Sequence, residues 1–149
     1  FDYYDSVTAH DSTLSACSFS ILASEVGRRE QALAHFLSTT LVDVEDRHAN
    51  ASHGVHMASL AGSWLALVWG FGGLRIGEDG VPAFAPTLPD GWRGYRFGMA
   101  WRGAELRVDV TADGATYRNL GAAAIAMRHG GEAVTVPPGG QWTGALVPA

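Results

Sequence analysis

HDSTLS at residues 10–15 opens a segment in which apolar side chains recur at helical spacing. Steps of three and four residues between apolar positions are typical of an amphipathic helix. The pattern stops at Gly27, and glycine readily adopts the left-handed conformation that ends many helices. We therefore predict a helix over residues 12–26. Asp11 or Ser12 would cap its first turn, since short polar side chains accept hydrogen bonds from the free amides of a helix start.

Two further helices follow in the sequence. Apolar residues recur at helical spacing over 28–44, and residues 46–54 are polar and irregular, which indicates a loop. GVHMASL at residues 54–60 leads into the apolar run WLALVW at 64–69. The resulting helix over 57–69 is apolar or small on nearly every side, so we expect it to be buried all round. Three such helices cannot bury their own surface, and the helical half is therefore expected to be incomplete.

The pattern changes after the glycine-rich GFGGL at residues 70–74. Large apolar side chains alternate with polar or small ones in YRFGMAW (95–101) and ELRVDV (105–110). This period of two is typical of strands with one buried face. Glycine-containing turn signals separate seven or eight such segments. We predict an antiparallel β-sandwich over residues 71–149, after a helical part over residues 1–70. The fold class is therefore mixed.

Charge and composition exclude several classes of protein. Residues 1–70 carry eight acidic and three arginine side chains, a net charge of −5, and residues 71–149 carry seven of each. Neither half is basic enough to bind nucleic acid, and the longest apolar run is far shorter than the roughly 20 residues that cross a bilayer. Cys17 is the single cysteine, so we expect a small core residue and a reducing, cytoplasmic setting. The start at Phe1 suggests a fragment or a processed chain.

Four side chains are candidates for binding an anion. The hydroxyls of Ser12, Thr13 and Ser15 lie at a predicted helix start, where free amides and the helix dipole favour negative charge. His56 lies just before another helix and neutralises an anion when protonated. Capping of the helix by the hydroxyls and burial of the histidine are structural alternatives, and the sequence leaves both open.

Two other groups of residues have simpler explanations. His48, His53 and His56 lie close to Asp46, and a metal site there is conceivable, but a polar loop that contains histidines explains the group without a metal. In the β part, Trp92 and Trp142 could stack on sugars. Their role stays open, whereas the alternation of Tyr95 and Trp101 with polar residues favours core positions.

The order of these segments resembles the C-terminal part of glycoside hydrolase family 65, which includes the maltose, trehalose and kojibiose phosphorylases. The resemblance rests on YYD at residues 3–5 and on the segments at 10–15, 54–60 and 64–74, and it weakens after about residue 120. It implies that residues 1–70 are the last helices of an (α/α)6 catalytic barrel and that residues 71–149 are a C-terminal β-sandwich.

The family resemblance also implies a phosphate site and a mechanism. Ser12, Thr13 and Ser15 match the serine-rich phosphate loop of these enzymes, with threonine where serine is frequent, and His56 matches their phosphate-binding histidine. Phosphate attacks the anomeric carbon while a glutamic acid protonates the glycosidic oxygen, with inversion. No glutamate of this chain matches that general acid, which is expected upstream, so no catalytic residue is assigned here. The reaction uses phosphate as co-substrate and needs no metal or other cofactor.

We expect as partners a disaccharide, inorganic phosphate, the remaining upstream part of the catalytic domain, and further copies in a homo-oligomer. Nucleic acid and membranes are not expected. Two alternatives remain. One is a hydrolase of the same family, of the trehalase type, and the other is a non-catalytic module that binds carbohydrate or a protein partner.

Overall fold

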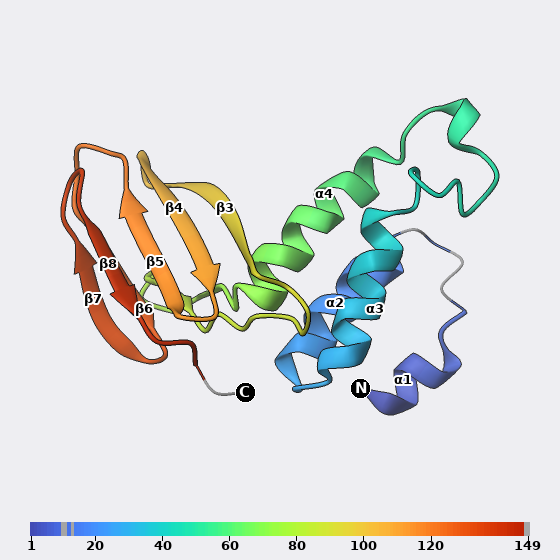
Figure 1. Ribbon diagram of the computed structural model, residues 1–149, viewed down its shortest axis with the longest axis horizontal. Helices are drawn as coiled ribbons and strands as arrows, with labels where there is room; N and C mark the ends of the chain where they lie inside the picture. Colours follow the sequence, from blue (N-terminus) through green and yellow to red (C-terminus); the bar gives the residue numbers. More distant parts are fainter. Residues whose placement is uncertain (10–11, 13, 148–149) are drawn as a thin grey trace. The chain divides into compact units, whose positions relative to one another are not determined.

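The computed structural model describes residues 1–9, 12 and 14–147, which form two compact units, Phe1–Gly70 and Phe71–Ala149. The first unit is helical, and the second is built from strands (Figure 1). The chain therefore has a mixed fold of helices and mostly antiparallel sheets. Within the described residues, no helix is both long and apolar enough to span a bilayer.

The helical unit is organised around three helices that follow a short N-terminal one. A 3-10 turn and a π-helical turn flank the last of them. The bounds are α1 Asp2–Val7, α2 Ser15–Glu25, α3 Arg29–Thr40, η1 Ala51–His53, α4 Met57–Leu65 and η2 Ala66–Phe71.

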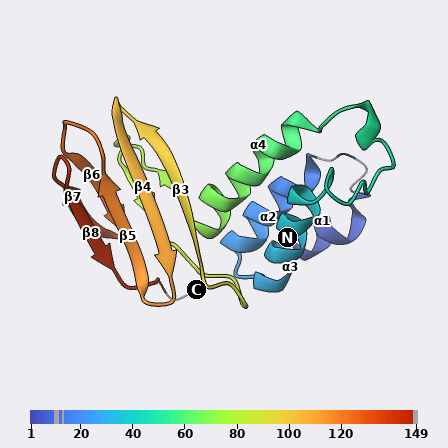
Figure 2. The ribbon, with the colours of Figure 1, turned by 45° about the horizontal axis from the view of Figure 1, so that its top comes forward.

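Small side chains let α2 pack closely on α3 and α4 (Figures 1 and 2). The buried residues of α2 are Ala16, Cys17, Ser20 and Ala23. The hydroxyl of Ser20 donates a hydrogen bond of 2.9 Å to the carbonyl of Ala32 on α3, so this buried polar group is paired. A Cβ atom at Gly62 of α4 would lie 2.9 Å from Cβ and Sγ of Cys17, so this position requires glycine.

The helices differ from the predicted ranges at their ends. α2 begins at Ser15 because the carbonyl of Ser12 accepts both the amide and the hydroxyl of Ser15 and closes a turn first. α3 ends at Thr40, short of the predicted residue 44, and the chain then turns repeatedly. In this turn the backbone angle φ is 46° at Asp46 and 52° at Ala49, values that no helix contains. The short α1 was not expected from the sequence.

The prediction that the third helix is buried all round is wrong for this chain. Ser59 and Gly62 of α4 are buried, but Met57, Leu60 and Trp64 expose 71%, 49% and 42% of their surface. Gly62 faces Cys17 of α2, and the described residues cover the large apolar side chains only in part. This uncovered surface agrees with the expectation that the helical half lacks packing partners.

The second unit contains two four-stranded sheets. Their strand orders are β1-β2-β6-β7 and β3-β4-β5-β8. The bounds are β1 Arg75–Ile76, β2 Pro82–Phe84, β3 Gly94–Trp101, β4 Ala104–Thr111, β5 Gly114–Asn119, β6 Ile125–His129, β7 Glu132–Val136 and β8 Gln141–Gly144.

One strand pair departs from the predicted antiparallel arrangement. β2 pairs with β6 in parallel, through Ala83 opposite Arg128 and Phe84 opposite His129. The other pairs are antiparallel. Because three strands of the other sheet intervene between β2 and β6, no hairpin turn constrains their direction, and a parallel pair becomes possible.

The period-two pattern of β3 and β4 is confirmed. Leu106, Val108 and Val110 of β4 are fully buried, and their neighbours along the strand are more exposed. Phe97 is buried in β3, whereas Tyr95 and Trp101 are half-buried on the same side. The core of this unit also contains Phe84 and Tyr117, whose ring centroids lie 5.2 Å apart. Since these rings come from β2 and β5, aromatic packing joins the two sheets.

Candidate functional site

The serine segment before α2 forms a local turn. The hydroxyl of Ser12 accepts a hydrogen bond of 3.3 Å from the amide of Leu14, and the hydroxyl of Ser15 donates one of 3.1 Å to the Ser12 carbonyl. The N-cap position of α2 is Leu14, and it makes no side-chain cap. Ser12 therefore closes a turn before the helix and does not cap it. Asp11 and Thr13, the other residues predicted here, lie outside the described residues.

His56 is the N-cap residue of α4 and is held by Asp43. One carboxylate oxygen, Oδ2, accepts the backbone amide of His56 at 2.8 Å, and the other, Oδ1, lies 2.5 Å from the ring Nδ1. Nε2 on the far side of the ring lies 3.4 Å from the amide nitrogen of Asn50. Both side chains of the pair are largely buried, with 22% of His56 and 15% of Asp43 exposed. The orientation of the His56 ring is therefore fixed: Nδ1, the inner nitrogen, faces Asp43, and Nε2, the outer nitrogen, faces away from it.

These hydrogen bonds also affect the acidity of Asp43. The bonds from the His56 side chain and backbone stabilise the charged carboxylate and lower the pKa of Asp43 below its ordinary value, against a smaller opposing effect of desolvation. Asp43 thus carries a negative charge at neutral pH.

The two predicted anion-binding segments lie at one end of the helical unit. A Cβ atom at Gly62 would meet Cys17, and one at Gly70 would meet Ile21 and Ser24. Later residues of α4 and its continuation η2 therefore contact later residues of α2, which means that the two helices run in the same direction. Cys17 is the third residue of α2 and Gly62 the sixth of α4, and the N-termini of the two helices point to the same end of the helical unit (Figures 1 and 2). The positive ends of the two helix dipoles therefore point the same way.

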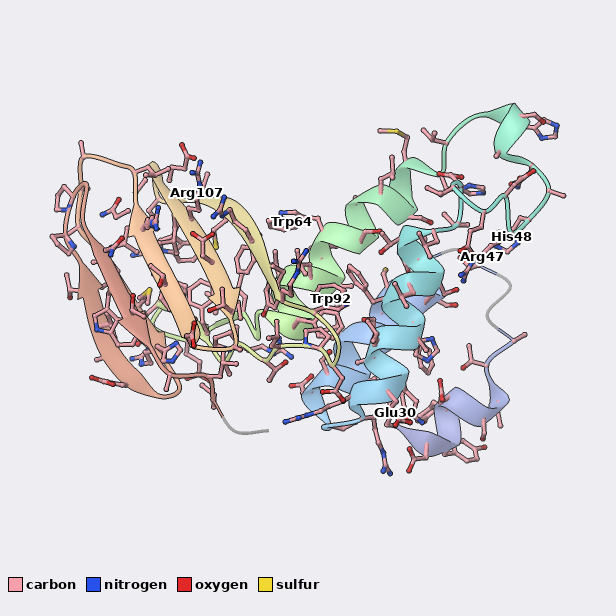
Figure 3. The ribbon with its side chains drawn as sticks, in the orientation of Figure 1. Glu30, Arg47, His48, Trp64, Trp92 and Arg107 are labelled. Atoms are coloured by element: carbon pink, nitrogen blue, oxygen red, sulfur yellow. The ribbon has the colours of Figure 1, made fainter. Side chains whose placement is uncertain are left out.

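The loop between α3 and α4 lies at that end too. Figure 3 shows Arg47 and His48 on this loop, and Glu30 at the opposite end of α3. The ring of His48 lies 6.1 Å from that of His56, centroid to centroid. Arg47 forms an ion pair of 2.7 Å with Glu45.

Three glutamates of the helical unit have exposed side chains. Glu25, Glu30 and Glu45 are exposed, and the exposed Glu45 is paired with Arg47. No general acid is assigned to any of them.

The histidine group does not form a metal site. His48 and His53 are exposed, and Asp46 accepts the amide of Ala51 at 2.8 Å through its Oδ1. Among the residues that the structure describes, no three His, Cys, Asp or Glu side chains come together to hold a metal ion.

The tryptophans left open by the sequence are packed against other rings. Trp92 lies 5.7 Å from Phe71 and 6.1 Å from Tyr95, centroid to centroid. Trp142 lies 5.0 Å from His129 and 5.9 Å from Tyr117. Both are half-buried. Their rings therefore have structural partners within the sheet unit.

Sequence reasoning missed Asp43. It lies inside the predicted helix over 28–44, where an acidic residue is ordinary, and its partner His56 is thirteen residues further along the chain. No sequence signal marks Asp43, because its position in a turn follows from the end of α3 at Thr40, which the sequence pattern did not predict.

Comparison with known proteins identifies the family of the chain. Residues 1–65 match the glycosyl hydrolase family 65 central catalytic domain, and residues 74–136 match the glycosyl hydrolase family 65 C-terminal domain. The chain belongs to glycosyl hydrolase family 65.

Among its relatives, an α,α-trehalose phosphorylase of Geobacillus stearothermophilus is 41% identical over 114 residues, which are 76% of this chain and 15% of the relative. A kojibiose phosphorylase of Caldanaerobacter subterraneus subsp. tengcongensis is 35% identical over 120 residues, 80% of this chain and 16% of the relative. The solved structure of a putative kojibiose phosphorylase from the human microbiome superposes with a TM-score of 0.86 at 30% identity, over 95% of this chain and 19% of that chain. The chain thus spans less than one fifth of the length of these relatives.

Proposed function

We propose that the chain is the C-terminal portion of an inverting phosphorylase of α-glucosidic disaccharides. In this proposal residues 1–70 are the last helices of an (α/α)6 barrel, and residues 71–149 are the C-terminal β-sandwich. Two features support it: the ordered match to both domains of the family, and relatives that are named trehalose and kojibiose phosphorylases.

Ser12, Thr13, Ser15 and His56 contribute to the phosphate site of the whole enzyme. The observation that carries this assignment is the parallel direction of α2 and α4, which opens both helix N-termini at one end of the unit. Hydroxyls, helix amides and an oriented imidazole at one place are suited to a divalent anion. The role of Thr13 rests on the family resemblance alone.

The proposed reaction is a single displacement. A glutamic acid from the part of the barrel that precedes this chain protonates the glycosidic oxygen as its bond to the anomeric carbon breaks. A phosphate oxygen forms the new bond from the opposite face, and the products are β-glucose 1-phosphate and a free sugar. The residues of this chain hold phosphate in line and balance its charge, which lowers the barrier by positioning and electrostatics.

Phosphorolysis is favoured over hydrolysis by the hydroxyl-rich segment at residues 12–15. Hydrolases of the family are expected to lack this hydroxyl-rich loop and to activate water with a carboxylate. The packed positions of Trp92 and Trp142 give no support to a separate sugar-binding module.

Anion binding by the 149-residue chain tests the assignment. Calorimetric titration with phosphate and with chloride at matched ionic strength should show binding specific to phosphate. His56→Ala and Ser15→Ala should each weaken it about tenfold or more, the effect of one lost hydrogen bond to a charged group. Ser18→Ala, at an exposed position on the same helix, is the matched control. Equal heats for phosphate and chloride, or binding unaffected by His56→Ala, would contradict the proposal.

A further inference from the structure

The contact between Asp43 and His56 has two parts that constrain the histidine completely. The carboxylate accepts the backbone amide of His56 at 2.8 Å and lies 2.5 Å from the ring Nδ1. One side chain therefore fixes both the backbone position of the residue and the rotation of its ring. A bond to the backbone alone would cap α4 but leave the ring free to turn.

The chemistry of the pair determines where the ring carries its proton. An ionised carboxylate only accepts hydrogen bonds, so Nδ1 must be the protonated nitrogen in neutral His56. Nε2 is then the nitrogen left to interact with other groups. In neutral His56 it accepts a hydrogen bond, and the amide nitrogen of Asn50 lies 3.4 Å from it. When the ring is protonated, both nitrogens carry hydrogen and Nε2–H becomes a donor.

We propose that Asp43 is the positioning residue for His56: it selects the Nδ1-protonated ring and directs Nε2 to the phosphate. This inference rests on the phosphate-site assignment above. Asp43 itself does not touch the anion, and its negative charge faces the far side of the imidazole. Carboxylates hold metal-binding histidines in the same way, through the ring nitrogen that does not bind the ligand.

The helical unit contains a second aspartate–histidine pair that serves as a control. Asp5 of α1 lies 3.0 Å from Nε2 of His35 on α3, and these side chains are also largely buried, with 23% and 18% exposed. This pair uses the opposite ring nitrogen, and neither of its residues belongs to the candidate phosphate-binding set, so we assign it no part in anion binding. Asp5→Asn therefore removes a comparable charge from the same unit.

Nitrogen-15 NMR of the imidazole side chains tests the inference directly. Neutral His56 of the unmodified chain should show a protonated Nδ1, and in Asp43→Asn the ring should shift toward the Nε2-protonated form, which is the commoner tautomer of free histidine. Asp5→Asn should leave the His56 signals unchanged. An Nε2-protonated His56 in the unmodified chain would overturn the inference without the need for any variant.

Titration of the same samples with inorganic phosphate adds the functional readout. Asp43→Asn should bind phosphate roughly tenfold more weakly, as is typical when the partner that orients a histidine ligand is lost. Asp5→Asn should bind it with unchanged affinity. Asp43→Asn that retains both the tautomer and the affinity for phosphate would show that Asp43 only caps α4, and would overturn the inference.

The outcomes separate this inference from the proposed function. If the unmodified chain binds phosphate no better than chloride but Asp43 still controls the tautomer, the phosphate-site assignment fails and the positioning of the ring by Asp43 is supported. If phosphate binds and His56 is required, but Asp43→Asn has no effect on either readout, the proposed function is supported and the inference fails.

Discussion

At the scale of single residues, His56 and His129 have identified partners at both ring nitrogens among the described residues. Nδ1 of His129 in β6 lies 2.8 Å from the hydroxyl oxygen of Tyr117, and Nε2 lies 2.7 Å from the carbonyl oxygen of Ala145. Because a carbonyl only accepts, Nε2 carries the proton, and Nδ1 accepts from Tyr117. His56 has the opposite arrangement, with Nδ1 bound to Asp43. His129 links a buried hydroxyl to a backbone carbonyl, whereas the outer nitrogen of His56 lies 3.4 Å from the side-chain amide of Asn50.

The bond between Tyr117 and His129 should contribute measurably to stability. Tyr117 is fully buried, and its burial raises the pKa of the hydroxyl, so the group stays neutral at physiological pH. Tyr117→Phe leaves Nδ1 of His129 without its donor, which should cost about 1–3 kcal/mol of unfolding free energy. Urea unfolding of the chain measures this cost. Tyr3→Phe, at a position that is 71% exposed, should change it by less than about 0.5 kcal/mol. Equal effects of the two variants would refute the assignment.

The lowered pKa of Asp43 predicts an acid-sensitive contribution to stability. Because the carboxyl is more acidic in the folded than in the unfolded chain, its stabilising effect is present above the unfolded pKa of about 3.9 and is lost as the pH falls through the folded value. The unmodified chain should therefore be more stable than Asp43→Asn at pH 5, and the difference should vanish in strong acid. Urea midpoints measured at both pH values check this. A difference that is the same at the two values would exclude a role for the charge.

At the scale of elements, the close approach of α2 and α4 is the feature that places the candidate site. It depends on the missing side chain at Gly62, which faces Cys17. Farther along, Gly70 lies against Ser24, whose hydroxyl bonds back to the carbonyl of Ser20. Two glycines on one helix thus keep the helices parallel and in contact, and a larger residue would separate their N-termini.

Gly62→Ala should therefore destabilise the helical unit in spite of the better helix propensity of alanine. The new Cβ would lie 2.9 Å from Cβ and Sγ of Cys17, and the position of that Cβ is fixed by the backbone of α2. Overpacking of this kind lowers the unfolding free energy by about 1–3 kcal/mol, whereas the higher helix propensity of alanine raises it by about 1 kcal/mol. A net loss of stability is therefore expected. In a double-mutant cycle, Cys17→Gly should relieve part of the clash, as measured by urea unfolding. Additive effects of the two changes would contradict the contact.

The sequence predicts the elements better than their ends and partners. The three main helices and the alternation in β3 and β4 follow from local spacing, which depends on neighbours in the chain. The end of α3 at Thr40, the π-helical turn Ala66–Phe71 and the parallel pair of β2 and β6 depend on contacts between distant segments. The candidate site divides in the same way. Residue type and position in the sequence identify Ser12, Ser15 and His56 as candidates. Asp43 is identified only from the structure, in which a turn brings it to His56.

At the scale of the whole chain, large apolar side chains remain uncovered mainly in the helical unit. Among the described residues, those that expose more than a third of their surface there are Tyr3, Tyr4, Val7, Leu14, Leu22, Val26, Leu37, Val44, Val55, Met57, Leu60, Trp64 and Leu65, against Ile76 and Leu120 in the sheet unit. An apolar surface of this extent is typical of an interface. In the proposed enzyme, the preceding part of the barrel covers it.

The isolated chain should consequently associate with itself. Sedimentation velocity should detect species larger than a 15.7 kDa monomer, and Leu60→Gln should shift the population toward the monomer. Leu120→Gln is the matched control, because Leu120 is 48% exposed and Leu60 is 49% exposed, but Leu120 belongs to the sheet unit. A chain that stays monomeric at all concentrations would argue against an uncovered interface.

The isolated chain should also fail to turn over disaccharides, because the proposed general acid belongs to the preceding part of the enzyme. Assays with trehalose or kojibiose and phosphate should release no glucose 1-phosphate above background. Phosphate-dependent turnover by the 149-residue chain would overturn this expectation.

The most direct test of the central claim replaces the matching segment of the Geobacillus trehalose phosphorylase with this chain and measures phosphorolysis. The account predicts a hybrid that releases β-glucose 1-phosphate from trehalose only when phosphate is present. It also predicts that His56→Ala raises the KM for phosphate at least tenfold while the KM for trehalose changes little. A hybrid that hydrolyses trehalose without phosphate, or whose KM for phosphate is unchanged by His56→Ala, would contradict the account.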